Sequence, residues 1–352
     1  MNTKNYKRLF AEVYEKGEID KELYDLLLGE IETDGKMTKR IYKLYLEELE
    51  RRRAFDVDGT PFDTRNSAKT DGTYVYMRPK RPFWHFWNAV SATIFKFIGW
   101  FGSGVGYGVW RIKDRKKLKK LKHKPFITVS NHVGYIDAVL TRRAMGCKKQ
   151  YIVAAPHNCK NTFGGRVLKS ATMIPLPITL SGTKLFNERL EYVRDRNAAI
   201  HFYAEKAMWV RYRKPRPYKD GAFVYADKLD VPVVPMLYCF KRARGLRRLF
   251  GLAKAVVRIA DPIFADKTLP MRERRADLAE RSAKAVRELY EDFYGIPLEY
   301  LPERERIGAA AELTNDAEAA ADRTANAGVA ESVGTEITRD APDINKTEEK
   351  LS

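Results

Sequence analysis

A histidine and an aspartate five residues apart, His132 and Asp137, are the residues of this sequence best suited to chemistry. They lie in the segment Ser130–Asp137, directly after the apolar run Pro125–Val129. An imidazole can accept a proton from a hydroxyl near neutral pH, and a carboxylate on its other ring nitrogen fixes the tautomer and stabilises the imidazolium. The pair predicts a general base, His132, oriented by Asp137, although such pairs also serve purely structural roles.

The elements that must position this pair alternate along the chain from residue 125 onward. On a regular helix, five residues rotate one side chain by about 140° from the other, so we expect the pair on a turn that enters a helix. Apolar runs predict strands at Phe126–Ser130, Gln150–Ala155, Met173–Leu176, Ala199–Tyr203, Val233–Tyr238 and Ala255–Ile259. Helices are expected at Asp137–Met145, Lys184–Arg194, Lys219–Leu229 and Arg272–Tyr290. This alternation predicts an α/β fold with a mixed, mostly parallel central sheet flanked by helices.

Three further motifs follow the pair in chain order. They are Tyr203-Ala204-Glu205-Lys206, the basic stretch Arg216–Phe223 with its Gly-Ala, and Val231-Pro232-Val233-Val234-Pro235. With the N-H-x4-D arrangement of residues 131–137, their order and spacing resemble the glycerolipid acyltransferase family, in particular the lysophosphatidic acid acyltransferase group. The resemblance covers roughly residues 84–300.

The resemblance implies transfer of a fatty acyl group from a thioester to a lipid hydroxyl. The donor would be acyl-CoA or acyl-carrier protein, and the acceptor a lysophospholipid, by default 1-acyl-glycerol-3-phosphate, which gives phosphatidic acid. His132 would take the proton from the acceptor hydroxyl, so the alcohol itself is the nucleophile and no acyl-enzyme forms. The absence of a G-x-S-x-G elbow agrees with that. We expect neither a cofactor nor a metal.

The resemblance also points to residues that would bind substrate. Glu205 matches the family's motif glutamate, which is associated with acceptor binding, and Asn131 would hold the turn beside the substrate. A phosphate would be bound by cationic side chains, for which the candidates are Arg166, Lys206 and Arg211. Two departures leave a different lipid alcohol open as the acceptor. Lys206-Ala207-Met208 replaces the family's Gly-Thr-Arg, and Met173–Pro177 lacks an expected arginine.

The charge of the chain is strongly basic and unevenly distributed. The net charge is +19, but residues 303–352 hold 12 acidic and 6 basic residues, which leaves +25 on the other 302 residues. A region with this positive charge can bind an anionic membrane surface, coenzyme A, an acidic carrier protein or a nucleic acid. No helix-turn-helix, zinc or RNP signature is found, so no nucleic acid is expected. Three scattered cysteines fit a reducing compartment and do not indicate a disulfide framework or a metal site.

Residues 83–110 form the most apolar stretch and hold four of the five tryptophans. A run of lysines and arginines follows, from Arg111 to Lys124. Interfacial aromatics and polybasic flanks are typical of a segment that associates with an anionic membrane, here the cytoplasmic face of the cell membrane. Lys96 favours a helix in the interface, or two short helices, over a spanning helix. Buried core helices are the alternative.

The sequence divides into four parts. We expect a helical appendage at 1–55, an irregular linker at 56–82, an acyltransferase domain at 83–302 and a disordered acidic tail at 303–352. The appendage either packs on the main domain or binds a partner. Pro232 and Pro235 are expected to put their strand at a sheet edge or a bend. Besides an active enzyme, two alternatives remain: an inactive membrane scaffold of the same fold, or a basic nucleic-acid-binding protein.

Overall fold

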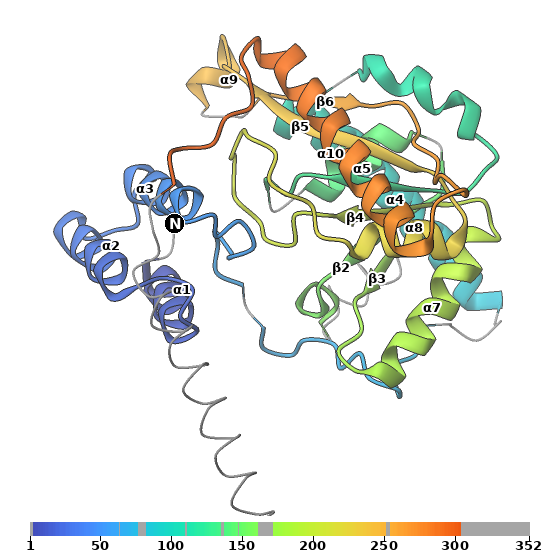
Figure 1. Cartoon of the computed structure of the whole chain (residues 1–352), viewed down its shortest axis with the longest axis horizontal. Helices are drawn as coiled ribbons and strands as arrows, with labels where there is room; N and C mark the ends of the chain where they lie inside the picture. Colours follow the sequence, from blue (N-terminus) through green and yellow to red (C-terminus); the bar gives the residue numbers. More distant parts are fainter. Residues whose placement is uncertain are drawn as a thin grey trace, which may run out of the picture. The chain divides into compact units, whose positions relative to one another are not determined.

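A six-stranded sheet forms the centre of the main domain, with the strand order β3-β2-β4-β1-β5-β6 (Figure 1). The strands are β1 (Phe126–Ser130), β2 (Gln150–Ala154), β3 (Met173–Pro175), β4 (Ala199–Tyr203), β5 (Val233–Lys241) and β6 (Lys254–Ile259). All neighbouring pairs are parallel except β5 and β6, which are antiparallel. The mixed, mostly parallel sheet expected from the sequence is confirmed.

The structure is a computed structural model. It describes residues 3–62, 64–76, 82–109, 111–134, 137–146, 148–160, 172–250 and 254–303. Residues 1–303 form one compact unit that includes the appendage, the linker and the α/β layer. The acidic tail beyond residue 303 lies outside the described residues.

Helices cover both faces of the sheet. One face carries α7 (Leu180–Arg194), α8 (Gly221–Leu229) and α10 (Met271–Tyr294), and the other carries α4 (Pro82–Tyr107), the 3-10 helix η1 (Lys113–Leu121) and α5 (Asp137–Met145). Alternate β1 side chains face opposite layers: Ile127 packs in the cluster with Phe186 and Phe223, and Phe126 in the cluster with Leu140. Figure 1 shows α10 crossing in front of the strands. Two shorter elements are η2 (Pro156–Cys159) and α9 (Leu246–Leu249).

Of the two positions expected for the proline strand, the sheet edge is wrong, because β5 lies inside the sheet between β1 and β6. Pro235 pairs with Val129 of β1 and accepts a hydrogen bond from the Ala260 N–H, 2.9 Å away. The antiparallel ladder with β6 begins at the next residue, Met236. Pro235 has no N–H, so one hydrogen bond is missing at the end of the β5–β6 ladder. An inner strand tolerates this loss at the end of a ladder.

The appendage is a three-helix bundle of α1 (Thr3–Glu15), α2 (Lys21–Asp34) and α3 (Lys39–Arg51). Side-chain caps begin two of its helices, since Asp20 and Thr38 accept hydrogen bonds from backbone N–H groups in the first turns of α2 and α3. The bundle core also contains Ala207 and Trp209 from the main domain. The appendage therefore packs on the main domain, one of the two expected alternatives.

Helix α4 is a single helix of 26 residues, so the alternative of two short helices is wrong. It ends at Gly108, whose φ of +68° lets its N–H bond to the Gly104 carbonyl and that of Val109 to the Ser103 carbonyl. One side of α4 packs on α5. In the described part of the chain, no helix combines the length and apolarity that crossing a bilayer requires.

Candidate active site

His132 and Asp137 meet at the carboxyl edge of the parallel strands, where ligands bind in open α/β sheets. His132 follows the end of β1, and Asp137 is the first residue of α5. The His132 Nδ1 lies 2.9 Å from the Asp137 Oδ2. Because an ionised carboxylate only accepts, Nδ1 carries the proton and Nε2 is left as the basic nitrogen. The pair sits on a turn that enters a helix, as expected.

Asp137 also closes the turn that carries His132. Its Oδ2 accepts the N–H groups of Val133 at 2.6 Å and Gly134 at 2.9 Å, and its side chain is 1% exposed. A Cβ at Gly134 would come within 2.9 Å of the Tyr107 hydroxyl and 3.0 Å of the Asp137 Oδ1. The glycine thus lets the chain bend around the carboxylate, and one side chain orients both the imidazole and its backbone.

The exposed side of the imidazole is open to a substrate. The His132 side chain is 21% exposed, and its ring stacks on that of Tyr203 at the end of β4, with centroids 4.1 Å apart. Among the described residues, none forms a hydrogen bond with its Nε2. The ring is held by a carboxylate on one edge and an aromatic on one face, and its basic nitrogen is left for an incoming hydroxyl.

Asn131 has a structural position. Its side chain is fully buried, its Nδ2 donates to the Tyr238 carbonyl at 3.1 Å, and its Oδ1 accepts the Tyr238 N–H at 2.8 Å. This pair of bonds joins the end of β1 to β5. The side chain therefore holds the turn, as expected, but the structure does not present it to a substrate.

Glu205 is also buried, which differs from the acceptor-binding role that the resemblance implied. Its Oε2 accepts the His132 N–H at 3.1 Å and the Arg216 Nη2 at 2.7 Å, and its Oε1 accepts the Arg216 N–H at 2.7 Å. Both side chains of this ion pair are at most 1% exposed. Glu205 thus fixes the backbone of His132 from the interior. The sequence motif includes Arg216 but did not reveal it as the partner.

The cationic candidates differ in position. Lys206 and Arg211 are exposed, and both adopt left-handed backbone conformations, with φ of +66° and +60°. The Lys206 Nζ lies 3.6 Å from an Asp56 carboxylate oxygen, and the Arg211 N–H donates to the Val133 carbonyl at 2.8 Å. Both therefore stand on the exposed side of the loop that contacts the His132 turn. Arg166 lies outside the described residues.

Trp209 links this loop to the N-terminal bundle, a link that sequence reasoning missed. Its N–H donates to the His132 carbonyl at 3.1 Å, and its indole Nε1 donates to the Val57 carbonyl at 2.8 Å. The ring is fully buried, and the Arg216 guanidinium lies over it, 4.5 Å from the centroid. The available signal was that Trp209 is the one tryptophan outside residues 83–110.

The linker also contributes a carboxyl group that sequence reasoning did not select. Burial raises the pKa of Asp58, while a backbone hydrogen bond from Met208 and electrostatic interactions with His132 and Lys206 act against that rise. The Asp58 carbonyl accepts a hydrogen bond from the Tyr45 hydroxyl at 3.0 Å. The segment between bundle and domain is therefore part of the surroundings of the imidazole.

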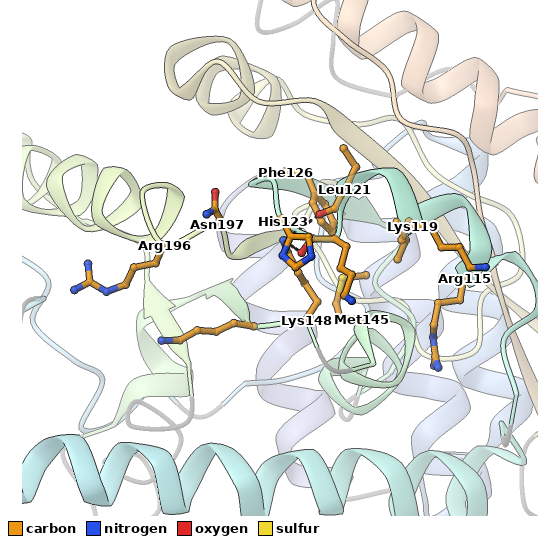
Figure 2. A pocket seen from close by; sticks show the side chains of 12 residues that line it. Arg115, Lys119, Leu121, His123, Phe126, Met145, Lys148, Arg196 and Asn197 are labelled. Carbon is orange, nitrogen blue, oxygen red and sulfur yellow. Dashed lines mark hydrogen bonds between the residues drawn. The ribbon is translucent and has the colours of Figure 1, made fainter.

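A basic cavity of about 530 Å³ lies at the other, amino edge of the sheet (Figure 2). Its lining comes from η1, from the end of α5, from the start of β1 and from the segments that lead into β1, β2 and β4. The lining residues are Arg115, Leu118, Lys119, Leu121, Lys122, His123, Phe126, Met145, Lys148, Lys149, Arg196 and Asn197. Lys148 is held in place by the Leu121, Lys122 and Lys124 carbonyls. This cavity is separate from the His132 site.

Comparison with known proteins gives a family match over the residues of the site. Residues 111–239 match the model of the Acyltransferase family, which supports the resemblance to the glycerolipid acyltransferases. Among solved structures, one match is the 1-acyl-sn-glycerophosphate (LPA) acyltransferase PlsC from Thermotoga maritima, with 18% identity over 58% of this chain and 97% of that chain and a TM-score of 0.36. No curated protein matches the chain.

Proposed function

We propose that the chain is a membrane-associated acyltransferase that moves a fatty acyl group from a thioester donor to the hydroxyl of a lysophospholipid. The donor is acyl-CoA or acyl-carrier protein, and the default acceptor is 1-acyl-glycerol-3-phosphate. One observation carries the proposal: His132, within the residues that match the Acyltransferase family, has its Nδ1 bonded to a buried carboxylate at 2.9 Å, and its Nε2 has no hydrogen-bond partner among the described residues. That is the arrangement a general base needs.

The reaction requires one proton carrier. The His132 Nε2 removes the proton from the acceptor hydroxyl as its oxygen attacks the thioester carbonyl carbon. The tetrahedral intermediate then collapses, the C–S bond breaks, and the departing sulfur takes the proton back from the imidazolium. Asp137 stabilises the imidazolium between these steps because its Oδ2 faces Nδ1 at 2.9 Å.

An acceptor that carries a phosphate needs cations beside the imidazole. Lys206 and Arg211 supply exposed cationic side chains on the loop that touches the His132 turn, and Arg166 is a third candidate from the sequence. Charge-assisted bonds to phosphate suit arginine and lysine. We assign these residues to the acceptor headgroup, while Glu205 and Asn131 shape the site from within.

We further propose that the enzyme works at the cytoplasmic face of a membrane. Two features support this. Large apolar side chains on α4 are exposed, including Phe86 at 67% and Phe97 at 63%, and the chain outside its acidic tail carries +25. An interfacial helix with basic surroundings binds anionic lipid surfaces.

The test is thioester consumption by the purified chain with anionic vesicles. Acyl-CoA and acyl-carrier protein would each be paired with a panel of lysolipids, and His132→Ala would be compared with His123→Ala, whose exposed side chain lies at the amino edge of the sheet. Loss of a general base lowers turnover by roughly 10²–10⁴-fold. His132→Ala should show this loss, and His123→Ala should turn over like the wild type.

Each outcome has one meaning. Transfer to lysophosphatidic acid that disappears in His132→Ala supports the default acceptor. Transfer only to another lipid alcohol would mean that the altered Lys206-Ala207-Met208 stretch is associated with a different acceptor substrate. Absence of transfer to any acceptor, by a folded protein, would favour the inactive membrane scaffold, and normal turnover by His132→Ala would refute the mechanism.

A further inference from the structure

Helix α4 presents a continuous apolar stripe to solvent. Ile94, Phe97, Phe101 and Val105 follow one another at helical spacing and are between 43% and 63% exposed. Ser103, on the opposite side of the helix, is buried, as are Ser91 and Gly104 on the flanks of the stripe, and the helix packs on α5. Apolar surfaces of this extent are uncommon on soluble monomers and mark interaction sites.

A second exposed apolar group lies on α9, in the connection between β5 and β6. Leu246, Leu249 and Phe250 are 72%, 77% and 69% exposed. A helix of four residues that leaves both of its leucines, and the phenylalanine that follows it, in water gains little stability from burial. Neither composition nor periodicity predicts this element, and the proposed chemistry at His132 does not use it.

The Arg247 guanidinium joins α9 to the end of α4. It donates to the carbonyl groups of Val105 at 2.7 Å and of Gly106 at 2.9 Å. These are carbonyls of the last helical turn, which an arginine both satisfies and favours through the helix dipole. Gly108 allows the approach, since a Cβ there would come within 3.1 Å of the guanidinium Nε. The exposed apolar side chains of α9 are thereby fixed beside the end of the α4 stripe.

The charges around α9 indicate what this surface meets. Arg242, Arg244 and Arg248 are exposed within eight residues of Phe250, and no ion pair joins them to the acidic residues that the structure describes. Arginines beside exposed leucine and phenylalanine match the boundary of an anionic bilayer, where apolar tips enter the acyl region and cations stay among headgroups.

We propose that α9 is a second membrane-inserting element, which places Leu246, Leu249 and Phe250 in the same anionic bilayer as the α4 stripe. This inference extends the proposed membrane association and gives the bilayer two attachment points. Attachment through both α4 and α9 would fix the tilt of the domain on the membrane surface. A single helix lying in the interface leaves that tilt free.

The experiment measures binding of the full chain to phosphatidylcholine vesicles that contain phosphatidylglycerol, by co-sedimentation. The test variant is Leu246→Ser/Leu249→Ser. The matched control is Phe264→Ser/Ile296→Ser, which removes two exposed apolar side chains (62% and 54%) from elsewhere in the domain. Because the test variant loses the burial of two leucine side chains in the acyl region, we expect it to bind at least about tenfold more weakly and the control to bind like the wild type.

A second readout reports insertion directly. A polarity-sensitive fluorophore on Leu249→Cys, in a Cys147→Ser background, should shift to shorter wavelength when vesicles are added, and the same fluorophore on Ile296→Cys should not. Unchanged vesicle affinity in Leu246→Ser/Leu249→Ser, or an unshifted fluorophore at position 249 on bound protein, would overturn the proposal.

These measurements are independent of catalysis. If the wild-type chain binds vesicles through α9 but transfers no acyl group, the proposed function fails and the α9 inference stands. If it transfers acyl groups to a dispersed short-chain lysolipid, the α9 variant should do so equally well and lose activity only on vesicle-borne acceptor. Equal losses on both acceptors would assign α9 to the folding of the domain instead.

Discussion

Glu205 shows how a motif residue can act through the backbone. Its carboxylate connects the His132 N–H to both the side chain and the N–H of Arg216, so it links the turn carrying the imidazole to the loop beside it. A buried ion pair contributes little net stability against an apolar replacement, but loss of one partner leaves the other charge unpaired. Glu205 is therefore best tested by removal of its charge alone.

We predict that Glu205→Gln lowers the free energy of unfolding by about 3–5 kcal/mol, because the Arg216 guanidinium would remain buried without its carboxylate. Urea unfolding monitored by tryptophan fluorescence would measure this. The comparison is Glu47→Gln, which removes one member of the exposed i,i+4 pair with Lys43 and should change stability by about 0.5 kcal/mol or less. Equal effects of the two substitutions would contradict the prediction.

His201 contributes a pH dependence to stability. Burial lowers the pKa of its fully buried imidazole to about 3, and its Nδ1 lies 2.8 Å from the Thr128 hydroxyl. The unfolded chain has a histidine pKa near 6.5, so it binds more protons than the folded chain between these values. This contribution is complete above about pH 6.5 and is lost as the pH falls toward 3.

We therefore predict that stability falls between pH 6.5 and 5 by up to about 1.4 kcal/mol per pH unit from this group. His201→Gln should flatten that slope even if it lowers stability at neutral pH. His123→Gln, at an exposed position, should leave the slope unchanged. Denaturation midpoints across this pH range are the measurement, and an unaltered slope in His201→Gln would refute the assignment.

Sequence reasoning selected the hydrogen-bonded pair His132 and Asp137 but not the residues that support it. His132 and Asp137 are close in sequence and differ from their apolar neighbours, so residue type and spacing sufficed to select them. The bonds from Glu205 and Asn131 connect residues 11 to 107 positions apart. Such long-range contacts leave no repeating pattern in the local sequence. From the sequence alone, a polar side chain that is buried in the fold cannot be distinguished from one that faces a ligand.

At the scale of elements, the N-terminal bundle is linked by hydrogen bonds to the loop that contacts the His132 turn. Trp209 fills the bundle core and also bonds to the His132 carbonyl. A second bond joins the same parts, from the Val210 N–H to the Tyr42 hydroxyl at 2.7 Å. The helices are thus placed to steady the His132 turn.

We predict that Trp209→Phe lowers kcat by about fivefold, because it keeps an aromatic ring but loses the indole hydrogen bond to Val57, worth ~1 kcal/mol. KM for the thioester donor should change little. Tyr24→Phe, in the partly buried Tyr14–Tyr24 stack of the bundle, serves as the control. Steady-state kinetics would decide, and identical kcat values for both variants would show that the bundle does not act on the site.

Most elements of the sheet could be predicted because apolar runs flanked by turns define them. β1, β4 and α5 have the bounds expected from the sequence. Two features could not be predicted. α9 has four residues, too few for a helical period, and the inner position of β5 depends on its pairing with β1 and β6 rather than on its prolines.

At the scale of the whole molecule, the charge of +25 outside the acidic tail would govern encounter with lipid in the proposed membrane association. The charged segment η1 contains Arg115 and five lysines within Lys113–Leu121. Exposed charges of one sign attract an anionic surface over about one Debye length, which is ~10 Å at 0.1 M salt. Membrane binding should therefore combine an electrostatic part with the apolar part supplied by α4 and α9.

We predict that affinity for phosphatidylglycerol-containing vesicles falls at least about tenfold between roughly 0.1 M and 0.5 M salt, since each cation near the surface contributes ~1 kcal/mol that salt screens. Binding to pure phosphatidylcholine vesicles should be weaker and nearly independent of salt. Tight DNA binding in ~0.15 M salt, without vesicle binding, would instead favour the nucleic-acid alternative.

The contact between Trp209 and the bundle has a consequence for synthesis. Helices α1–α3 leave the ribosome before Trp209, yet this tryptophan completes their core and bonds to a residue 152 positions earlier in the chain. Contacts so distant in sequence form late in folding, because the entropy of closing a long loop is lost before the contact stabilises the chain. In a nascent chain the core of the bundle therefore lacks the Trp209 indole until the strand and loop that shape the His132 turn have also been translated.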